Sequence, residues 1–557
     1  KTCAVITASG EFVWYCPKRF DRPAFFSKLI DPEKGGYWSF SLRNKKFLSR
    51  KYIERSAILV SKYEGLEVTD FMPMDTDFSG IARMFSEAPA LINNDIFLKP
   101  FYGLGLPELE LIGNKIHISR SLVLSASHPL KVRNNHVIFT IPKGEKGWVF
   151  LSDLSSKENI SGELLQELKD HTLKKWQKIS GQIVYDGIYK NKVLDSIRAI
   201  QLLTYEENGG IIAAATTSLP EVPGGERNYD YRYVWLRDSA MITSALIRAE
   251  SNGVEEQKFL SFLCDAKYRN SQKMLLPFYS LDKLVAQPET YLPLSGYLES
   301  QPVRIGNDAM DQLQLDTNAN VLLAAKLIYE RFGKEYHWET VEGIADLLAE
   351  RWMEDDHGIW EEHIKKPFTS SKVVVAKSLE FISDYAENET QKKRWQQAAN
   401  DIRNFVRENC LTSEGAYATY PGSNRVDITA ALFPVWLYED PGSPEMKKTI
   451  QILEKNHSKG NLYHRTLECF DASKEGVFLA GCFWMAQYYV MCNDLEKAEN
   501  IIEAALKFNN DLGFFAEEGD AGSGEMLGNF PQTFVHASFI GVVIDLRAAR
   551  KKLADAP

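Results

Sequence analysis

Two pairs of adjacent glutamates, each placed after aromatic residues in a loop-like segment, are the first candidates for chemistry in this sequence. Glu361 and Glu362 follow Trp360, and Glu517 and Glu518 follow two phenylalanines. An apolar neighbour raises the pKa of a carboxyl group by desolvation, which keeps it protonated and able to donate a proton. A second carboxylate can then activate water by taking a proton from it. Adjacent glutamates are more often solvated surface charge, so the pairs alone leave both interpretations open.

The segment 229–238 combines aromatic and charged residues at a density that loops rarely reach without a binding role. It holds three tyrosines, a tryptophan, two arginines and two aspartates at the start of a predicted helix. Guanidinium and carboxylate groups satisfy the paired hydroxyls of a sugar, and aromatic faces cover its apolar C–H side. We therefore predict that this segment, which includes Trp235, contacts a sugar. The alternative is that Arg237 and Asp238 only cap the helix and pair with each other.

Two further residues are weaker candidates for substrate contact. Arg304, in the loop-like segment 302–307, either contacts a substrate or forms a structural ion pair. His536 lies in a predicted helix after Pro531, where a core position is the simpler expectation and a substrate contact is the alternative. The dispersed His and Cys residues lack metal-ligand spacing, and the sequence has neither a phosphate-binding glycine loop nor a GxSxG elbow. We therefore expect no metal and no cofactor.

The elements that must position these residues change in type along the chain. Short runs rich in Val, Ile, Phe, Tyr and Trp predict a many-stranded β domain over residues 1–158, followed by a helical linker over 159–185. Residues 186–557 show helical spacing with long Gly- and Pro-bearing loops, which favours six helical hairpins closed in a ring, an (α/α)6 barrel. A solenoid is the rival arrangement, but no fixed-period repeat supports it. The twelve predicted helices span 193–204, 236–250, 255–268, 312–332, 338–352, 371–385, 390–408, 428–437, 444–456, 478–491, 495–508 and 533–551.

Composition excludes several classes of protein. The 557 residues are 44% hydrophobic and 25% charged, which is typical of globular chains, and a net charge of −10 gives no reason to bind nucleic acid or anionic membranes. The most apolar stretch, 477–490, is too short and too polar to span a bilayer. Seven scattered cysteines without CxxC spacing indicate reduced thiols, so we expect a cytoplasmic protein. The first residues lack an initiator Met and a secretory signal, so we expect the numbering to begin inside the native chain.

Taken together, these segments resemble glycoside hydrolase family 15, the glucoamylase family, in its bacterial and archaeal two-domain form. Residues 14–23 resemble the signature of the family's N-terminal β-sandwich. Residues 217–221 and 227–238 resemble the first active-site loop, and residues 527–532 resemble the closing motif of the barrel. The resemblance runs almost end to end and implies an α+β multidomain protein, an antiparallel β-sandwich followed by an all-α (α/α)6 barrel.

The resemblance also implies roles. Glu361 matches the family's general acid and Glu517 its general base, in an inverting single displacement. Only motif alignment separates this base from its neighbour Glu518, which we expect to bind substrate. Glu362 matches a residue that helps to bind the next sugar. Arg237 and Asp238 match a pair that grips the terminal glucose. The further contacts implied are Tyr231, close to the developing oxocarbenium centre, with Trp360 and Arg304.

The substrate implied is a malto- or isomalto-oligosaccharide, attacked from its non-reducing end with release of β-D-glucose. Two alternatives stay open at this point. One is a trehalase with the same fold and mechanism, since relatives of this architecture include trehalases. The other is a catalytically silent glucan-sensing or regulatory module built on the same barrel. The sequence gives no indication of oligomeric state.

Overall fold

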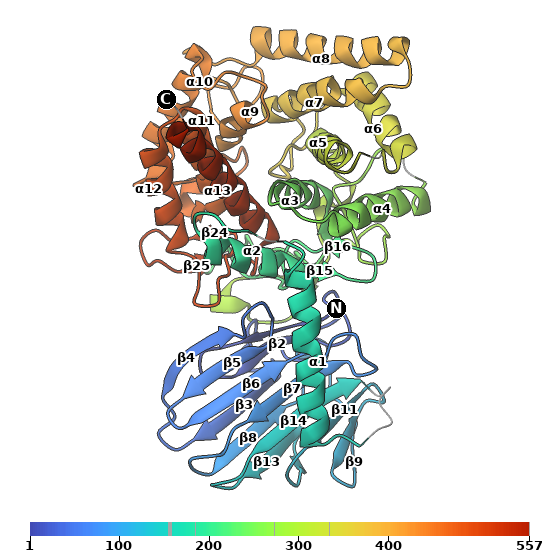
Figure 1. The fold of residues 1–557 in the computed structure, drawn as a ribbon, viewed down its shortest axis with the longest axis vertical. Coiled ribbons are helices and arrows are strands. Elements are labelled where there is room, and N and C mark those ends of the chain that lie inside the picture. Colours follow the sequence, from blue (N-terminus) through green and yellow to red (C-terminus); the bar gives the residue numbers. More distant parts are fainter. Residues whose placement is uncertain (154–158, 184, 272, 334, 556–557) are drawn as a thin grey trace. The chain divides into compact units, whose positions relative to one another are not determined.

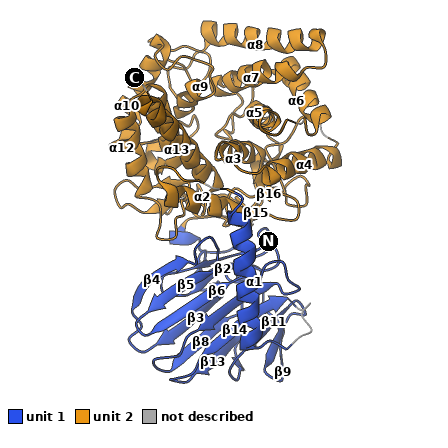
Figure 2. Ribbon diagram, viewed as in Figure 1, with its two compact units in different colours: residues 1–182, 293–299 blue, residues 183–292, 300–557 orange. Residues whose placement is uncertain are grey.

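The computed structural model describes residues 1–557 except 154–158, 184, 272, 334 and 556–557 (Figure 1). Its contacts divide the chain into two compact units, residues 1–182 with 293–299, and residues 183–292 with 300–557 (Figure 2). The domain boundary predicted at residue 158 lies outside the described residues. Most of the segment predicted as a linker forms the helix α1 (Gly162–Ser180), which groups with the first unit.

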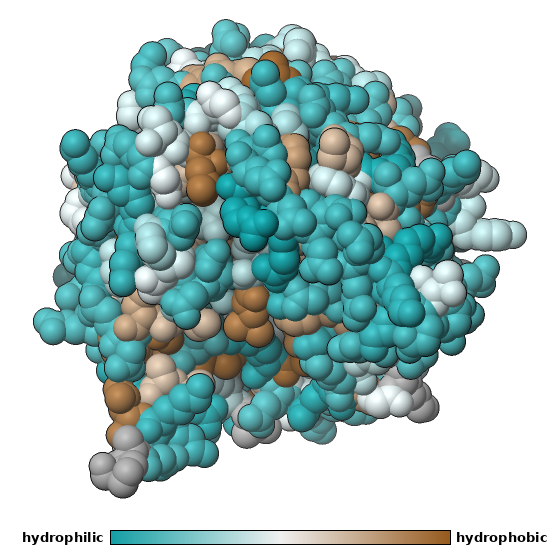
Figure 3. All heavy atoms as spheres, turned by 90° about the horizontal axis from the view of Figure 1, so that it is seen from above, coloured by the Kyte–Doolittle hydropathy of each residue, from teal (hydrophilic) through white to brown (hydrophobic). Residues whose placement is uncertain are grey.

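Hydrophilic side chains cover most of the face seen in Figure 3, where apolar side chains are scattered. Among the described residues, no helix combines the length and the apolar character that a bilayer crossing requires.

Two antiparallel sheets form the described part of the first unit. One has six strands in the order β1-β2-β3-β8-β13-β12, and the other has eight in the order β4-β5-β6-β7-β14-β11-β10-β9. Alternating burial along β3, β8 and β13 turns one face of the first sheet inward. The strands are β1 (Cys3–Ile6), β2 (Phe12–Cys16), β3 (Tyr37–Leu42), β4 (Phe47–Tyr52), β5 (Leu59–Tyr63), β6 (Leu66–Phe71), β7 (Gly80–Phe85), β8 (Ile92–Phe97), β9 (Leu109–Ile112), β10 (Lys115–Ile118), β11 (Leu122–Ala126), β12 (Lys131–Arg133), β13 (His136–Ile141) and β14 (Gly147–Asp153).

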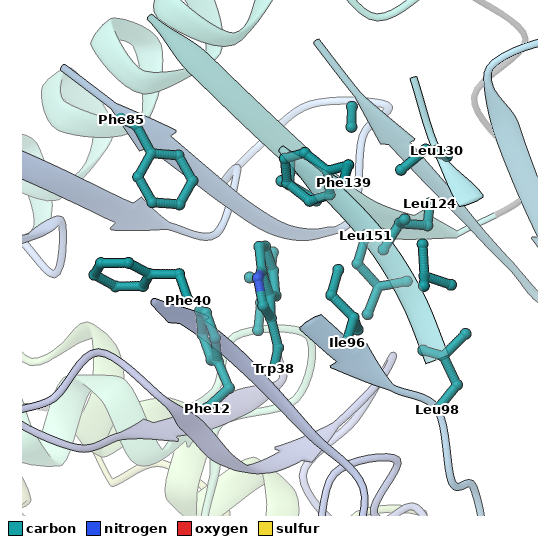
Figure 4. Packing of buried hydrophobic residues seen from close by; sticks show 14 of the residues in the cluster. Phe12, Trp38, Phe40, Phe85, Ile96, Leu98, Leu124, Leu130, Phe139 and Leu151 are labelled. Carbon is teal, nitrogen blue, oxygen red and sulfur yellow. The ribbon is translucent and has the colours of Figure 1, made fainter. Parts of the chain in front are cut away.

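The core of this unit lies between the two sheets, as a β-sandwich requires. Phe12, Trp38 and Ile96 from the first sheet meet Phe85 and Leu151 from the second (Figure 4). The outer face of the larger sheet is apolar as well, and α1 covers it. The predicted β-sandwich is therefore confirmed.

A buried ion pair crosses two strands of the larger sheet. Arg83 on β7 stands opposite Asp70 on β6, and its Nε and one terminal nitrogen donate to the carboxylate at 2.7 and 2.9 Å. The other terminal nitrogen donates to the carbonyl of Gly10, and the guanidinium lies over the rings of Phe12 and Trp38. Because Arg83 is fully buried, its charge depends on these partners.

We expect Arg83→Met to destabilise the β unit by about 3–5 kcal/mol, because it leaves the Asp70 carboxylate buried without its counter-charge. The matched control is Lys62→Met, which removes a half-exposed pair with Glu67 and should cost less than about 1 kcal/mol. Denaturant unfolding followed by tryptophan fluorescence measures both. An Arg83→Met midpoint equal to that of Lys62→Met would contradict a stabilising role for the pair.

Twelve α-helices occupy the described part of the second unit. Contacts between successive members close an inner ring of α3, α5, α7, α9, α11 and α13, and α13 returns to α3. The outer helices are α2, α4, α6, α8, α10 and α12, so the predicted (α/α)6 barrel is confirmed. The helices are α2 (Lys190–Leu203), α3 (Leu236–Arg248), α4 (Val254–Arg269), α5 (Leu315–Phe332), α6 (Trp338–Arg351), α7 (Thr369–Ile382), α8 (Glu389–Asn409), α9 (Leu432–Val435), α10 (Pro444–Asn456), α11 (Leu479–Met491), α12 (Leu495–Leu506) and α13 (Thr533–Ala554).

The prediction of a single helix over 428–437 is wrong. The structure has a 3-10 turn, Ile428–Ala431, followed by the four-residue α9. Pro434 lacks a backbone N–H and is tolerated only in a first helical turn, and Leu437 has a left-handed φ of 59° that ends the segment.

Short strands tie the loops of the barrel together. They are β15 (Thr204–Tyr205), β16 (Gly210–Ile211), β17 (Val234–Trp235), β18 (Phe278–Tyr279), β19 (Thr290–Leu292), β20 (Val303–Ile305), β21 (Ser458–Lys459), β22 (Leu462–Tyr463), β23 (Val477–Phe478), β24 (Glu518–Gly519) and β25 (Met526–Leu527). Two of them, β17 and β23, directly precede the inner helices α3 and α11, which fixes where side chains at the helix starts point.

Candidate active site

A cavity of about 410 Å³ opens in the second unit, where loops meet the N-terminal ends of α3, α11 and α13. Its volume is in the range of small-molecule sites. Nine of the predicted site residues line it, namely Tyr231, Trp235, Arg237, Asp238, Arg304, Trp360, Glu361, Glu362 and Glu517.

Glu361 lies in a turn and is held by a tryptophan. Its φ of 56° is left-handed, and its Oε1 accepts a hydrogen bond from Nε1 of Trp235 at 2.6 Å. A terminal nitrogen of Arg237 lies 3.5 Å from the same oxygen. The Glu361 side chain is 20% exposed, so it is reachable from the cavity while one of its oxygens is fixed.

Glu517 is more deeply buried than Glu361, and one of its oxygens lacks a hydrogen-bond partner in the described structure. Oε1 accepts from the Tyr231 hydroxyl at 3.1 Å, whereas the buried Oε2 has no hydrogen-bond partner among the described residues. Gly528, at φ 80°, faces this oxygen, and a Cβ added there would lie 3.3 Å from it. Burial, together with repulsion from Glu221, raises the pKa of Glu517 well above its ordinary value, against the opposing effects of Arg465 and the Tyr231 hydrogen bond.

The two donors that hold these carboxylates are neighbouring rings. Trp235 stacks on Phe278, its partner across β17 and β18, with ring centroids 4.2 Å apart. Tyr231 meets the edge of Trp235 at 5.4 Å between centroids. The segment singled out for its composition therefore links Glu361 to Glu517 through aromatic side chains, with a separate donor for each carboxylate.

Arg237 and Asp238 form an ion pair with each other, in which Nε and Oδ1 lie 3.4 Å apart. Arg237 donates to Gln314 at 3.2 Å and lies 3.6 Å from Asp316, but its Nε and the Oδ1 of Asp238 have no hydrogen-bond partner in the described part of the chain. Burial raises the pKa of Asp238 to about 6, with the Arg237 guanidinium opposing that rise. Asp316, also buried and without a hydrogen-bond partner on either oxygen, lies behind the cavity lining next to Arg237, and the sequence interpretation did not single it out.

Arg304 makes structural contacts and also lines the cavity. Its Nε pairs with Glu289 at 2.9 Å, and a terminal nitrogen donates to the carbonyls of Glu226 and Asn228. Although Arg304 lines the cavity, the described contacts of its guanidinium are structural, because they tie the loop before α3 to β20.

Trp360 and Glu362 are also anchored. Nε1 of Trp360 donates to Asp427 at 2.7 Å, and the Arg465 guanidinium lies 5.4 Å from its ring centroid. Oε1 of Glu362 accepts from the backbone N–H of Glu468 at 2.5 Å. Both side chains thus present fixed surfaces to the cavity.

The structure places Glu518 and His536 away from the cavity lining. Glu518 is fully buried, with one oxygen bound by the N–H of Gly476 and the other 3.3 Å from Arg465. His536 is fully buried, and its Nε2 accepts from the N–H of Phe515 while Nδ1 faces Ser196 at 2.9 Å. The substrate contact predicted for His536 is corrected to a core role, because the imidazole fixes the backbone two residues before Glu517.

Sequence reasoning also missed a buried arginine. Arg465 contacts Glu221 at 2.8 Å, Glu475 at 2.9 Å and Glu518 at 3.3 Å. Carboxylate oxygens of these three glutamates lie within 4.8 Å of one another, which is close enough for a metal ion, but the Arg465 guanidinium already supplies the cation between them. Glu221 belongs to the motif 217–221, whereas nothing in the sequence around Arg465 marks it.

With this geometry in place, comparison with known proteins identifies the family. Residues 187–464 and 489–543 match the family described as glycosyl hydrolases family 15, and residues 1–142 match the one described as trehalase-like, N-terminal. The chain belongs to glycosyl hydrolase family 15. The predicted resemblance is confirmed, and the protein is a glycoside hydrolase.

Relatives and solved structures extend the likeness over the whole chain. The trehalase of Thermoplasma volcanium is 30% identical, covering 99% of this chain and 93% of its own length. Trehalase 2 of Sulfolobus acidocaldarius is 29% identical over 97% of each chain. A bacterial glucoamylase solved with acarbose shares the fold, with a TM-score of 0.71 and 12% identity over 100% of this chain and 94% of that one.

The core role of His536 predicts a pH dependence of stability. Burial lowers the pKa of His536 to about 3, so the unfolded chain binds the proton first as the pH falls below 6.5. The contribution of the neutral imidazole is complete above pH 6.5 and is lost as the pH falls toward 3. We expect wild type to lose about 2 kcal/mol more than His536→Gln between pH 7 and pH 5, measured by urea unfolding.

His337→Gln is the matched control, because that side chain is exposed and contacts only the Ser261 hydroxyl among the hydrogen bonds described. Carboxyl groups titrate in every variant, so their effects cancel in the comparison. Equal pH dependence in wild type and His536→Gln would contradict a neutral, buried imidazole.

Proposed function

We propose that this glycoside hydrolase cleaves α,α-trehalose with inversion, with Glu361 as the general acid and Glu517 as the general base. The observation that carries the substrate is the full-length similarity to proteins named trehalase, together with the trehalase-like N-terminal match. It favours the trehalase alternative over the malto- or isomalto-oligosaccharide substrate that the sequence first suggested. The catalytically silent alternative has no support, because the family match is to glycoside hydrolases and two differently held carboxyl groups line one cavity.

Glu361 is suited to donate the proton. Trp235 and Arg237 both engage Oε1, so we assign Oε2 to carry the proton to the oxygen that joins the two glucose units. As the bond to the anomeric carbon breaks, that oxygen takes the proton and leaves as the hydroxyl of an α-glucose.

Glu517 is suited to activate water. The Tyr231 hydroxyl donates to Oε1, whereas Oε2 has no hydrogen-bond partner in the described structure. Oε2 can therefore take a proton from a water molecule that attacks the anomeric carbon from the opposite face. The attacked sugar leaves as β-glucose. Inverting enzymes place the two carboxyl groups about 6.5–9.5 Å apart to admit this water. Glu518 is less suited, because both of its oxygens face the protein around Gly476 and Arg465.

The sugar that is attacked would be gripped by Arg237 and Asp238. Each has a buried polar atom without a hydrogen-bond partner in the described structure. A buried polar atom that makes no hydrogen bond costs free energy until a ligand supplies one. Nε of Arg237 and Oδ1 of Asp238 face each other in an ion pair at 3.4 Å, and this adjacent donor and acceptor match a sugar hydroxyl pair.

We expect Glu361→Gln and Glu517→Gln each to lower kcat by about 10²–10⁴-fold, because each removes a group that transfers a proton. The control is Glu525→Gln, which makes the same charge change at an exposed residue outside the cavity lining. Glucose release from trehalose measures all three. Wild-type activity in either catalytic variant would move the assignment to another carboxylate.

A substrate panel and product stereochemistry test the reaction itself. We expect kcat/KM for trehalose to exceed that for maltose, isomaltose and maltotriose by at least about 100-fold, because a site that pairs with sugar hydroxyls rejects analogues that leave its polar groups unpaired. Early proton NMR spectra should show α- and β-glucose in equal amounts. Preference for maltotriose would restore the oligosaccharide substrate, and α-glucose alone would indicate retention.

A further inference from the structure

A cluster of buried charges lies beside Glu517. Arg465 and Arg227 are its two cations, and Glu221, Glu475 and Glu518 are its acids; we call these five residues the Arg465 cluster. Arg465 touches all three acids, while Nε of Arg227 contacts Glu221 at 3.0 Å and also pairs with Glu475. Four members are at least nine-tenths buried, and only the Arg227 side chain, at 21%, has appreciable exposure. Three carboxylates against two guanidinium groups leave the cluster with one excess negative charge when all are ionised.

The Tyr231 hydroxyl joins this cluster to Glu517. Its oxygen lies 3.1 Å from Oε1 of Glu517 and 3.4 Å from Oε1 of Glu221. A phenol has one proton to donate, so the two carboxylates compete for it. A change in the charge or position of Glu221 therefore alters the electrostatic environment of Glu517 in two ways, through the shared Tyr231 hydroxyl and directly through space.

Glu221 lines the cavity, yet its oxygens already have partners. Oε2 accepts from Arg227 and from Arg465 at 2.8 Å, and Oε1 faces the Tyr231 hydroxyl. Three donors directed at two oxygens match an ionised carboxylate, which only accepts. This arrangement favours a role within the protein over direct contact with a sugar.

We infer that Glu221 is a positioning residue for Glu517. Glu221 shares the Tyr231 hydroxyl with Glu517 and sets the charge state in which Glu517 works. The inference rests on the proposed role of Glu517 as the general base. The charged and titratable groups facing Glu517 are Tyr231 and Glu221 from the loop before α3, Arg465 and Glu475 from the segment between β22 and β23, and Glu518 on β24.

The expected effect has a definite sign. The Glu221 carboxylate repels charge on Glu517 and so raises its pKa, whereas Arg465 and the Tyr231 hydroxyl oppose that rise. Removing the charge of Glu221 also leaves the two guanidinium groups less neutralised. Both changes make the Glu517 carboxylate easier to form, so the base becomes active at lower pH.

The test is the pH profile of kcat/KM for trehalose, whose acidic limb reports the base of the free enzyme and whose alkaline limb reports the acid. In Glu221→Gln we expect the acidic limb to move down by about one pH unit while the alkaline limb stays in place. Glu525→Gln, the same charge change at an exposed residue, should move neither limb. A Glu221→Gln profile that is lowered at every pH with an unmoved acidic limb would overturn the inference.

Tyr231→Phe supplies a second test with the opposite sign. It removes the hydroxyl that stabilises the Glu517 carboxylate, so the acidic limb should move up. If Glu221→Gln fails to fold, an unmoved limb in Tyr231→Phe overturns the inference alone. Glu517→Gln separates the two proposals, because wild-type activity in that variant refutes Glu517 as the base, whereas an unmoved limb in Glu221→Gln refutes only the link to Glu221.

Discussion

The loops that line the cavity around Glu517 are held together by the buried guanidinium of Arg465. A buried cation needs close counter-charges, and breaking such a set costs several kcal/mol because the remaining charge is left uncompensated. Glu221, Glu475 and Glu518 come from loops far apart in the chain and meet at this one side chain. Because Arg465 pairs with all three acids, it fixes the relative positions of the loop before α3, the segment before β23 and the start of β24. The loop before α3 carries Tyr231, β23 carries Phe478, and Glu517 directly precedes β24.

The barrel supplies rigidity to these loops. The inner helices α5, α11 and α13 are buried along most of their length, so they cannot shift without disturbing close-packed neighbours. Functional side chains sit where loops meet the starts of such helices, which combines a fixed scaffold with freedom to choose side-chain type. The pairing of β17 with β18 then stacks Trp235 on Phe278 and aims its N–H at Glu361.

Sequence patterns predicted the parts of this arrangement that depend on local periodicity or on rare motifs. Short runs of β-forming residues predicted a many-stranded β domain, and the family resemblance implied that it is a sandwich. Helical spacing favoured the barrel, and the composition of 229–238 predicted a binding segment that lines the cavity. Arg465 and Asp316 were missed because their roles depend on which distant groups converge on them, and a single charged residue gives no local sign of that. For His536 the core position was the simpler expectation, but its partners Ser196 and Phe515 could not be named, because burial against them is a long-range property.

The two glutamate pairs look alike in sequence, yet the backbone gives them different uses. Glu518 lies in β24 and Glu517 directly precedes it, so consecutive side chains turn to opposite sides, one toward Arg465 and one toward the cavity. Glu361 instead adopts a left-handed φ of 56°, which breaks such alternation and lets both Glu361 and Glu362 line the cavity. One pair thus divides its carboxyl groups between the cavity and the buried charges that support it, while the other presents both to the same space. The difference lies in backbone conformation, which is why two identical dipeptides could not be told apart by composition.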